Sequence, residues 1–313
     1  MWGYIVRRIL ATIPVVAVVA VVVFSILHLA PGDPAAVIAG DQATPQQIAA
    51  IHARLGLDRP FHEQFLVWLG NLSRGDFGTS IFSNLPVSTL FLQRLEPTIA
   101  LTITTTLLTV GLAVPIGVIA AWKAGSWADR AVMTFAVLGF SFPVFVIGYI
   151  LILVFAIWLD LLPIQGYRSL EEGLWPFLRH LVLPSLALGI SFMALIARIT
   201  RASVLEVLSQ DHIRTARAKG LPTRQLLFDH ALPNAAVPIV TIIGVGVAIL
   251  LGGVVVTESV FAIPGLGRLV VDAILHRDYP VIQGALLIFS GVYVLVNLAI
   301  DLLYVVIDPR IRY

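Results

Sequence analysis

Six long apolar stretches restrict this chain to a fold that crosses a lipid bilayer. A helix needs about 20 predominantly apolar residues to cross the hydrocarbon core. Apolar residues are 58% of the chain and charged residues 12%, against roughly 25% charged in a typical soluble domain. Too few charged side chains remain to cover a soluble surface, so we expect an all-α integral membrane protein. Its six transmembrane helices are expected near residues 9–30, 97–122, 131–159, 180–200, 235–257 and 283–307.

The basic residues predict which ends of these helices face the cytoplasm. With the N-terminus inside, twelve of the 20 Lys and Arg residues lie on the cytoplasmic side and four lie in the short opposite loops. The remaining four lie in the long 31–96 loop, which the positive-inside rule largely ignores. Arg7 and Arg8 precede an apolar stretch longer than the usual signal-peptide core of about 7–15 residues. We therefore expect a retained N-terminal helix (1–30) and cytoplasmic N- and C-termini.

The external 31–96 loop is the part that resembles a soluble subdomain. Thr44 suits the N-cap of a helix and Pro45 its first turn. A second amphipathic helix is expected over 61–72. Two roles stay open for this loop, a cap packed on the membrane domain or a docking surface for an external partner. Residues 97–313 then form the membrane-embedded core.

Four threonines in the second apolar stretch share one helical face. They are spaced at i, i+3, i+4 and i+7, namely Thr102, Thr105, Thr106 and Thr109. Such a stripe is a candidate lining for a translocation path. Threonine hydroxyls in membrane helices also bond back to the carbonyl four residues earlier, or bridge neighbouring helices. Both interpretations stay open.

Other residues inside the apolar stretches are polar or disturb a helix. Pro115 and Pro143 lie within the second and third stretches and are expected to kink those helices. Asn297 and Asp301 lie one turn apart in the last stretch, where an acid is a functional candidate. We find no second deeply buried acid, Lys or Arg to complete a proton relay. This absence weighs against a stand-alone secondary transporter or channel. Because Asp301 lies beside Tyr304 and near Arg310, Asn297 and Asp301 are interpreted as a structural polar pair, with a proton relay as the alternative.

A basic, helix-forming segment at about 201–234 separates the fourth and fifth apolar stretches. Gly220 is expected to end its first helix in the left-handed conformation, and Pro222 to open a second. One side of that second helix is apolar, carrying Leu226, Leu227 and Ala231. A merely solvated loop would need neither this length nor these helices. The segment therefore predicts a compact unit that meets another protein in water.

The spacing of Gly220, nine residues and then His230-x-Leu232-Pro233 resembles the EAA loop of ABC-importer membrane subunits. That loop has the pattern Glu-Ala-Ala-x3-Gly-x9-Ile-x-Leu-Pro. Arg214-Thr215-Ala216 stands at the Glu-Ala-Ala positions, so the acid and one alanine are absent, and His230 replaces the Ile. The form Arg-Thr-Ala-Arg-Ala-Lys-Gly is typical of the dipeptide/oligopeptide/nickel permease family. Further segments resemble signatures of that family, namely 29–34, 75–78, 261–267, 277–280 and 297–312.

This resemblance implies the type I ABC importer permease fold and a multi-pass protein of the cell (inner) membrane. In such systems a second homologous permease subunit completes the path, two cytoplasmic ATP-binding subunits dock on the EAA loops, and an external substrate-binding protein delivers the cargo. The residues that the resemblance assigns to ATPase docking are Asp211, Arg214, Thr215, Ala216, Arg217, Ala218, Lys219, Gly220, His230, Leu232 and Pro233. We expect contact with membrane lipid and none with nucleic acid.

The chain carries none of the motifs expected of an enzyme. It has no cysteine, no His-Glu-x-x-His, no Gly-x-Ser-x-Gly and no Gly-x4-Gly-Lys-Ser/Thr phosphate loop. ATP is therefore expected on partner subunits, and we expect no catalytic residue, cofactor or metal site here. The favoured cargo is a di- or oligopeptide, with nickel or another small solute as the alternative. A nickel path would be expected to show clustered His or carboxylates, whereas His28 and His180 are isolated.

Overall fold

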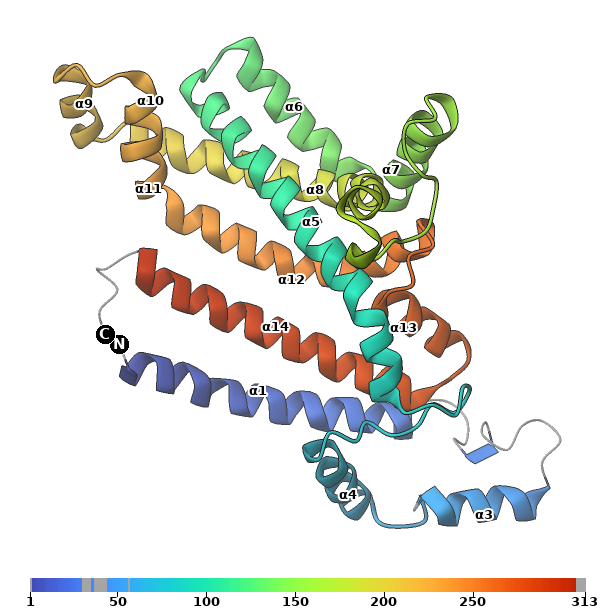
Figure 1. Ribbon diagram of the computed structural model, residues 1–313. Coiled ribbons are helices and arrows are strands. Elements are labelled where there is room, and N and C mark those ends of the chain that lie inside the picture. Colours follow the sequence, from blue (N-terminus) through green and yellow to red (C-terminus); the bar gives the residue numbers. More distant parts are fainter. Residues whose placement is uncertain (1, 30–34, 37–43, 56, 308–313) are drawn as a thin grey trace. The chain divides into compact units, whose positions relative to one another are not determined.

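The computed structural model describes residues 2–29, 35–36, 44–55 and 57–307, and helices make up most of that part (Figure 1). The only extended pairing among these residues is a single antiparallel bridge between Thr79 and Pro86. Helices η1 and η3 are π-helical and η2 is a 3-10 turn. The elements in chain order are α1 (Trp2–Leu29), α3 (Pro45–Leu55), α4 (Phe61–Ser73), α5 (Val87–Trp122), α6 (Trp127–Ser141), α7 (Val144–Leu151), η1 (Ile152–Trp158), η2 (Leu170–Glu172), α8 (Leu174–Leu208), α9 (Asp211–Ala218), α10 (Thr223–Gln225), η3 (Leu226–Ala231), α11 (Leu232–Asn234), α12 (Ala236–Val260), α13 (Leu266–Leu275) and α14 (Tyr279–Ile307).

The helices provide several membrane spans. Helices α5, α8 and the Tyr279–Leu303 part of α14 are each long and apolar enough to cross a bilayer. Two bent pairs would each qualify as one span, α6 with Val144–Trp158, and Thr223–Asn234 with Ala236–Val247. Helix α1 contains a shorter apolar stretch, Leu10–Ile26. By length and composition, the described residues therefore provide three helices able to span a membrane, or up to five if each bent pair is one span. Six spans with cytoplasmic termini stay a prediction.

The third predicted span, 131–159, is not one continuous helix. Helix α6 ends at Ser141, α7 begins at Val144, and the bent pair turns through 107°. Phe142 between them is extended (φ −100°, ψ 131°), because the ring of Pro143 disfavours a helical backbone at the preceding residue. The expected kink at Pro143 is therefore a break, and Pro143 stands at the N-cap of a new helix.

Two compact units make up the described chain. The first contains Glu96–Gly267 and the residues of α14 from Leu295 onward. Helix α8 runs through its centre, with α5, α6 and α12 around it (Figure 1). The core of this unit is aliphatic and aromatic, and includes Leu101, Leu188, Phe192, Ile196, Val254 and Phe261. A helix with buried residues along most of its length, such as α8, is suited to hold its neighbours in fixed positions.

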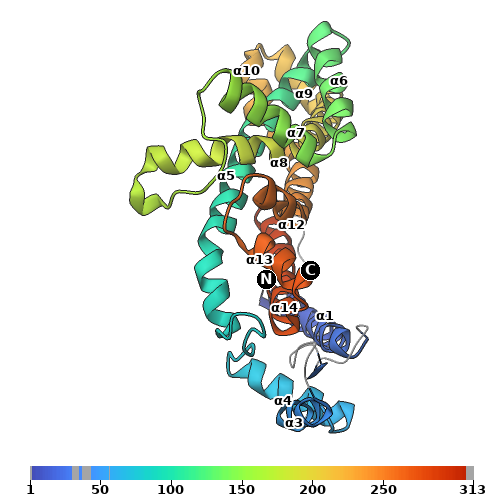
Figure 2. The same cartoon turned by 90° about the vertical axis from the view of Figure 1, so that its right-hand side faces the viewer.

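The second unit contains Trp2–Leu95 and Arg268–Val294. Its helix α1 lies beside the part of α14 up to Val294 (Figure 2), and the amide of Gln283 donates to the carbonyl oxygen of Val23 at 3.3 Å. Phe24 of α1 contacts three aromatic rings of α4, with centroids 5.1 to 5.4 Å away, namely Phe61, Phe65 and Trp68. The predicted helices from Pro45 and over 61–72 are confirmed. Helix α4 of the 31–96 loop therefore packs on α1, and both predicted roles of this loop stay open.

Candidate functional site

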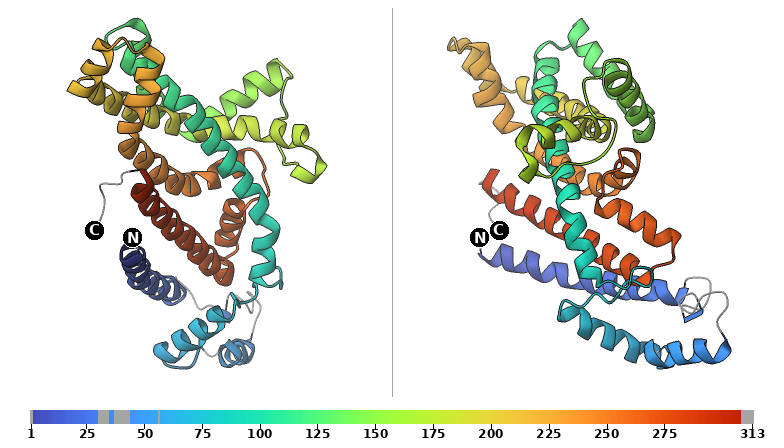
Figure 3. Two further views of the ribbon diagram at one scale, coloured as in Figure 1. Left: turned by 60° about the vertical axis from the view of Figure 1, so that its left-hand side comes forward. Right: turned by 45° about the vertical axis from the view of Figure 1, so that its right-hand side comes forward.

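The basic segment between α8 and α12 forms a helical unit at one end of the first compact unit (Figure 3). Helix α8 continues to Leu208, and α9 begins at Asp211 after only two residues. Helices α10, η3 and α11 then lead into α12. The predicted order of helix, turn and helix is confirmed, and Pro222 stands at the N-cap of the second helix as expected. We call residues 211–234 the coupling unit.

A hydrophobic cluster anchors the coupling unit to α5 and α8. Ile213 of α9 is fully buried, and it packs in one cluster with Leu226 and Leu227 of η3. The cluster also takes residues from the longer helices, namely Val118 and Ala121 of α5 and Val204 and Val207 of α8. Burying a side chain such as Ile213 contributes about 1.5–3 kcal/mol. Sequence reasoning missed Ile213, although it is the one large apolar residue in the otherwise polar α9.

The opposite face of α9 is open to solvent. The exposed members of the predicted docking set on and next to α9 are Asp211, Arg214, Thr215, Arg217, Ala218, Lys219 and Gly220. Asp211 and Arg214 pair at 3.4 Å, but their side chains are 95% and 73% exposed, so the pair contributes about 1 kcal/mol at most. Ala216 is half-buried and turns towards the cluster. The docking residues of α9 therefore form one polar surface on an anchored helix.

Other members of the predicted docking set have contacts within the chain. The guanidinium carbon of Arg217 lies 5.7 Å from the ring centroid of Trp122, an attractive cation–π contact between α9 and the end of α5. His230 and Leu232 are half-buried on the second helix, and Pro233 is exposed. Leu232 packs against the hydrophobic cluster. Arg217 and Leu232 therefore help to fix the coupling unit as well as to shape its surface.

Gly220 ends α9 in the way that the sequence predicts. Its φ angle is +82°, in the left-handed region. The N–H of Gly220 donates to the carbonyl oxygen of Arg217 at 3.0 Å, and that of Leu221 to Ala216 at 3.3 Å. These two bonds form a Schellman motif, the usual end of a helix at a glycine. A Cβ added to Gly220 would meet no atom within 4 Å, so the backbone conformation, and not lack of space, is what favours glycine.

The threonine stripe of α5 divides into two pairs. The hydroxyls of Thr102 and Thr106 donate to the carbonyl oxygens of Thr98 and Thr102, at 2.8 and 2.7 Å. Thr105 and Thr109 are fully buried against α8, where a Cβ on Gly189 would lie 2.6 Å from the Thr109 hydroxyl. Hydrogen bonding to the carbonyl four residues earlier is thus confirmed for Thr102 and Thr106. Thr105 and Thr109 instead pack closely against α8. A role for the stripe in the translocation path stays a prediction.

Asn297 and Asp301 lie one turn apart on α14, and both are half-buried. Neither is without an interacting group. Their role as a structural polar pair stays a prediction. The expectation that no second acid is deeply buried is wrong, because Glu258 at the end of α12 is fully buried. Glu258 lies at the end of an apolar helix, where the sequence alone does not show whether a side chain is buried.

Glu258 holds the 261–267 segment in place. The Thr98 hydroxyl donates to Glu258 Oε1 at 2.6 Å, and the N–H of Leu266 donates to the Thr98 oxygen at 2.8 Å. The N–H of Ile263 donates to the Glu258 carbonyl oxygen at 2.9 Å. The carboxylate therefore reaches this segment through Thr98, a residue 160 positions away.

Two further signature segments meet within the second compact unit. The carboxylate of Asp278 accepts hydrogen bonds from the Ser80 hydroxyl and from the N–H of Ile81, the latter at 3.1 Å. A Cβ on Gly78 would lie 3.6 Å from the Cβ of Pro280, at ordinary van der Waals contact. Asp278 thus ties the 277–280 segment to the residues that follow the 75–78 segment, about 200 positions earlier in the chain.

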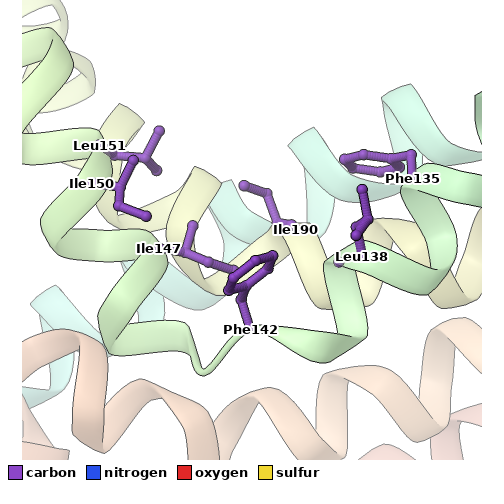
Figure 4. A pocket seen from close by; sticks show the side chains of 8 residues that line it. Phe135, Leu138, Phe142, Ile147, Ile150, Leu151 and Ile190 are labelled. Carbon is purple, nitrogen blue, oxygen red and sulfur yellow. The ribbon is translucent and has the colours of Figure 1, made fainter.

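An apolar pocket of about 260 Å³ lies at the break between α6 and α7 (Figure 4). Leu138 and Phe135 come from α6, Ile147 and Ile150 from α7, and Ile190 from α8. Phe142 stands between the two helices (Figure 4). The lining offers no polar side chain, so the pocket has no group that would hold the charged ends of a peptide.

Comparisons with known proteins agree with this arrangement. Residues 113–313 match the family described as "Binding-protein-dependent transport system inner membrane component", and residues 1–102 match its N-terminal counterpart. The inward-facing methionine ABC transporter MetNI has the same fold at a TM-score of 0.59 and 18% identity, covering 71% of this chain and 97% of that one. The likeness to this solved structure concerns the fold alone.

Relatives of the same length extend the match to the whole chain. A probable peptide ABC transporter permease of Sinorhizobium fredii is 55% identical over 310 residues, 99% of each chain. The glutathione transport system permease protein GsiC of Escherichia coli K12 is 46% identical over 313 residues, 100% of each chain. In this family the ATPase activity resides in separate subunits. The chain belongs to the binding-protein-dependent transport system inner membrane components, and is a multi-pass permease subunit of an ABC importer.

Proposed function

We propose that this permease subunit imports di- and oligopeptides. The observation that carries the proposal is the end-to-end similarity to relatives named as peptide and glutathione permeases, at 55% and 46% identity. A second homologous permease subunit completes the translocation path, and an external substrate-binding protein delivers the cargo. The path then passes between two similar subunits.

The coupling unit is the proposed contact with two cytoplasmic ATP-binding subunits. Its exposed face carries Arg214, Arg217 and Lys219, while Ile213 on the buried face fixes the helix to the membrane-embedded core. A helix anchored in this way transmits a displacement, because it cannot slide independently of α5 and α8. ATP-driven movement of the ATP-binding subunits would therefore move the transmembrane helices.

An uptake experiment tests the cargo. A parent strain and a strain that lacks the gene for this protein are each given labelled dipeptides, tripeptides, glutathione and nickel ion. Loss of peptide uptake, restored by the wild-type gene and not by Gly220→Pro, is the expected result. Loss of nickel uptake alone would replace peptide with nickel. Unchanged uptake of every compound would contradict the peptide proposal and shift attention to the ligand of the binding protein.

A cross-linking experiment tests the docking surface. The chain has no cysteine, so a single introduced thiol is the only one it carries. Ala218→Cys, on the exposed face of α9, is expected to cross-link to an ATP-binding subunit. Trp175→Cys is a matched control, since that side chain is also exposed but lies at the start of α8, 36 positions before α9 begins. Cross-links from both positions would contradict docking through α9. Cross-links from neither position would also contradict it, and this is the result expected of a channel or secondary transporter that has no ATP-binding subunit.

A further inference from the structure

The first turn of α6 is tied to α8 by a two-point ion pair. The Arg201 guanidinium donates through Nε and Nη2 to the two carboxylate oxygens of Asp129, the second contact at 2.7 Å. The Asp129 side chain is only 6% exposed and that of Arg201 24%. The N–H of Gly125, in the turn between α5 and α6, donates to the same carboxylate at 2.9 Å. One carboxylate thus joins the α5–α6 turn, α6 and α8, and the planar fork of the arginine fixes their orientation.

Close helix packing beside the pair removes free space between the same elements. A Cβ on Gly117 of α5 would lie 2.7 Å from the carbonyl oxygen of Ala197 in α8. A Cβ on Gly139 of α6 would lie 3.1 Å from the Cβ of Ala194 in α8. The Ser191 hydroxyl donates to the carbonyl oxygen of Gly139 at 2.8 Å. Helices α5 and α6 therefore have little freedom to slide along the half of α8 that leads into α9.

Arg201 lies where movement of the coupling unit would enter the core. Asp211, the first residue of α9, follows Arg201 by ten positions, and the intervening Val204 and Val207 belong to the cluster that anchors Ile213. Helix α6, held at its first turn by Asp129, leads to the break at Phe142 and to the apolar pocket there. The ion pair thus stands between the coupling unit and the break in the third predicted span.

We propose that Asp129 and Arg201 are positioning residues that make α6 and the α5–α6 turn move with α8 and α9 as one body during transport. The inference rests on the proposed docking of α9 to an ATP-binding subunit. Without the pair, hydrolysis on the partner subunits continues, but α6 no longer follows α9. An unpaired charge would also remain in a nearly buried place, which favours separation of the two helices.

A distance measurement tests the proposal without any substrate. Nitroxide labels are placed at Thr134→Cys on α6 and Ala202→Cys on α8, both exposed positions, in the complete complex with cysteine-free partner subunits. The wild-type distance distribution is expected to be the same with and without a non-hydrolysable ATP analogue. In Asp129→Asn it is expected to broaden when the nucleotide is added. A nucleotide-dependent shift in the wild type, or an unchanged distribution in the variant, would overturn the proposal.

A coupling measurement gives the functional readout. In the reconstituted complex, Asp129→Asn and Arg201→Gln are each expected to lower peptide taken up per ATP hydrolysed by about tenfold or more, because a nearly buried pair is broken. ATP hydrolysis should change by less than about twofold, since the docking surface of α9 is intact. Arg201→Lys should be intermediate, because a lysine cannot make the two-point contact.

The control variant is Glu172→Gln, which breaks the exposed ion pair of Arg168 and Glu172, whose side chains are 56% and 45% exposed. It should leave the peptide taken up per ATP hydrolysed unchanged, because exposed pairs contribute little. Uptake and hydrolysis falling in proportion would show a merely structural role and overturn the proposal. A wrong cargo would abolish wild-type uptake and leave the distance measurement as predicted. Failure of the proposed cargo is thereby distinguished from failure of this inference, and failure of the proposed docking is recognised by loss of the Ala218→Cys cross-link.

Discussion

Gly265 and Glu258 fit together so closely that a methyl group has no room between them. A Cβ on Gly265 would lie 2.0 Å from Glu258 Oε1 and 2.2 Å from its Cδ. The carboxylate is fully buried and hydrogen-bonded to Thr98, so it cannot move aside without losing that bond. We expect Gly265→Ala to lower the free energy of unfolding by about 1–3 kcal/mol.

The measurement is the melting temperature of the purified complex in detergent. Gly291→Ala is the control, because a Cβ at that position in α14 would meet nothing within 4 Å and alanine favours helix. Its melting temperature should equal or slightly exceed that of the wild type. A Gly265→Ala protein as stable as the control would show that Glu258 is not confined as described.

Gly220 permits a comparison between backbone conformation and space. No atom lies within 4 Å of an added Cβ, and the φ angle is +82°. Asparagine adopts left-handed conformations more readily than other residues with a Cβ, so Gly220→Asn should retain most uptake. Gly220→Val should lose about 1–2 kcal/mol in the turn and much of the uptake. If the two variants are present in the membrane in equal amounts and show equal uptake, this turn has no role in coupling.

Residues whose role depends on local backbone could be predicted from the sequence, whereas residues with distant partners could not. The turn at Gly220 and the helix start at Pro222 follow from local rules, and both are confirmed. Asp129 pairs with a residue 72 positions away, and Glu258 with one 160 positions away. No local periodicity encodes such a partner, so a single sequence gives no signal for it.

Among the helices, α5 and α8 approach each other closely at Gly117, which has no side chain. A Cβ on Gly117 would lie 2.6 Å from the Thr200 Cβ and 2.7 Å from a backbone oxygen of α8, which cannot rotate away. Gly117→Ala is expected to force the helices apart and to cost about 1–3 kcal/mol. Gly111→Ala is a matched control on the same helix, since its Cβ would meet nothing within 4 Å.

Thermal unfolding of both variants in detergent checks this prediction. Gly111→Ala should be as stable as the wild type or slightly more stable, because alanine favours helix over glycine. Gly117→Ala should melt at a lower temperature and lose uptake if α5 must move with α8. Indistinguishable melting curves would mean that the two helices do not pack as closely as described.

The lengths of the apolar stretches predicted where the long helices lie, but they did not predict the break in the third span. The stretches predicted at 97–122 and 180–200 lie inside α5 and α8. A proline inside an apolar stretch is compatible with a kink or with a complete break. Contacts made by the chain on either side decide between them. Here the Ser191 hydroxyl of α8 bonds to Gly139 of α6, whereas a Cβ on Gly148 of α7 would lie 3.3 Å from Val260 and Phe261.

For the whole molecule, the bent pair formed by α6 and Val144–Trp158 determines on which side of the membrane the coupling unit lies. Ala124 precedes this pair and Leu170 follows it, and both are exposed. Helix α8, which is long enough to cross the membrane, separates Leu170 from Ala218. A complete crossing by the pair puts Ala124 and Ala218 on the same side, whereas a re-entrant pair puts them on opposite sides.

Single cysteines in this cysteine-free chain distinguish the two arrangements. We expect Ala124→Cys and Ala218→Cys to react with a membrane-impermeant maleimide in inverted vesicles and not in intact cells. Leu170→Cys should show the opposite pattern. Exposed Phe82→Cys, in the 31–96 loop, should label like Leu170→Cys and serves as the control for the outer side. Labelling of Ala124→Cys and Leu170→Cys from the same side would make the pair re-entrant, and would place α9 where no cytoplasmic ATP-binding subunit can reach it.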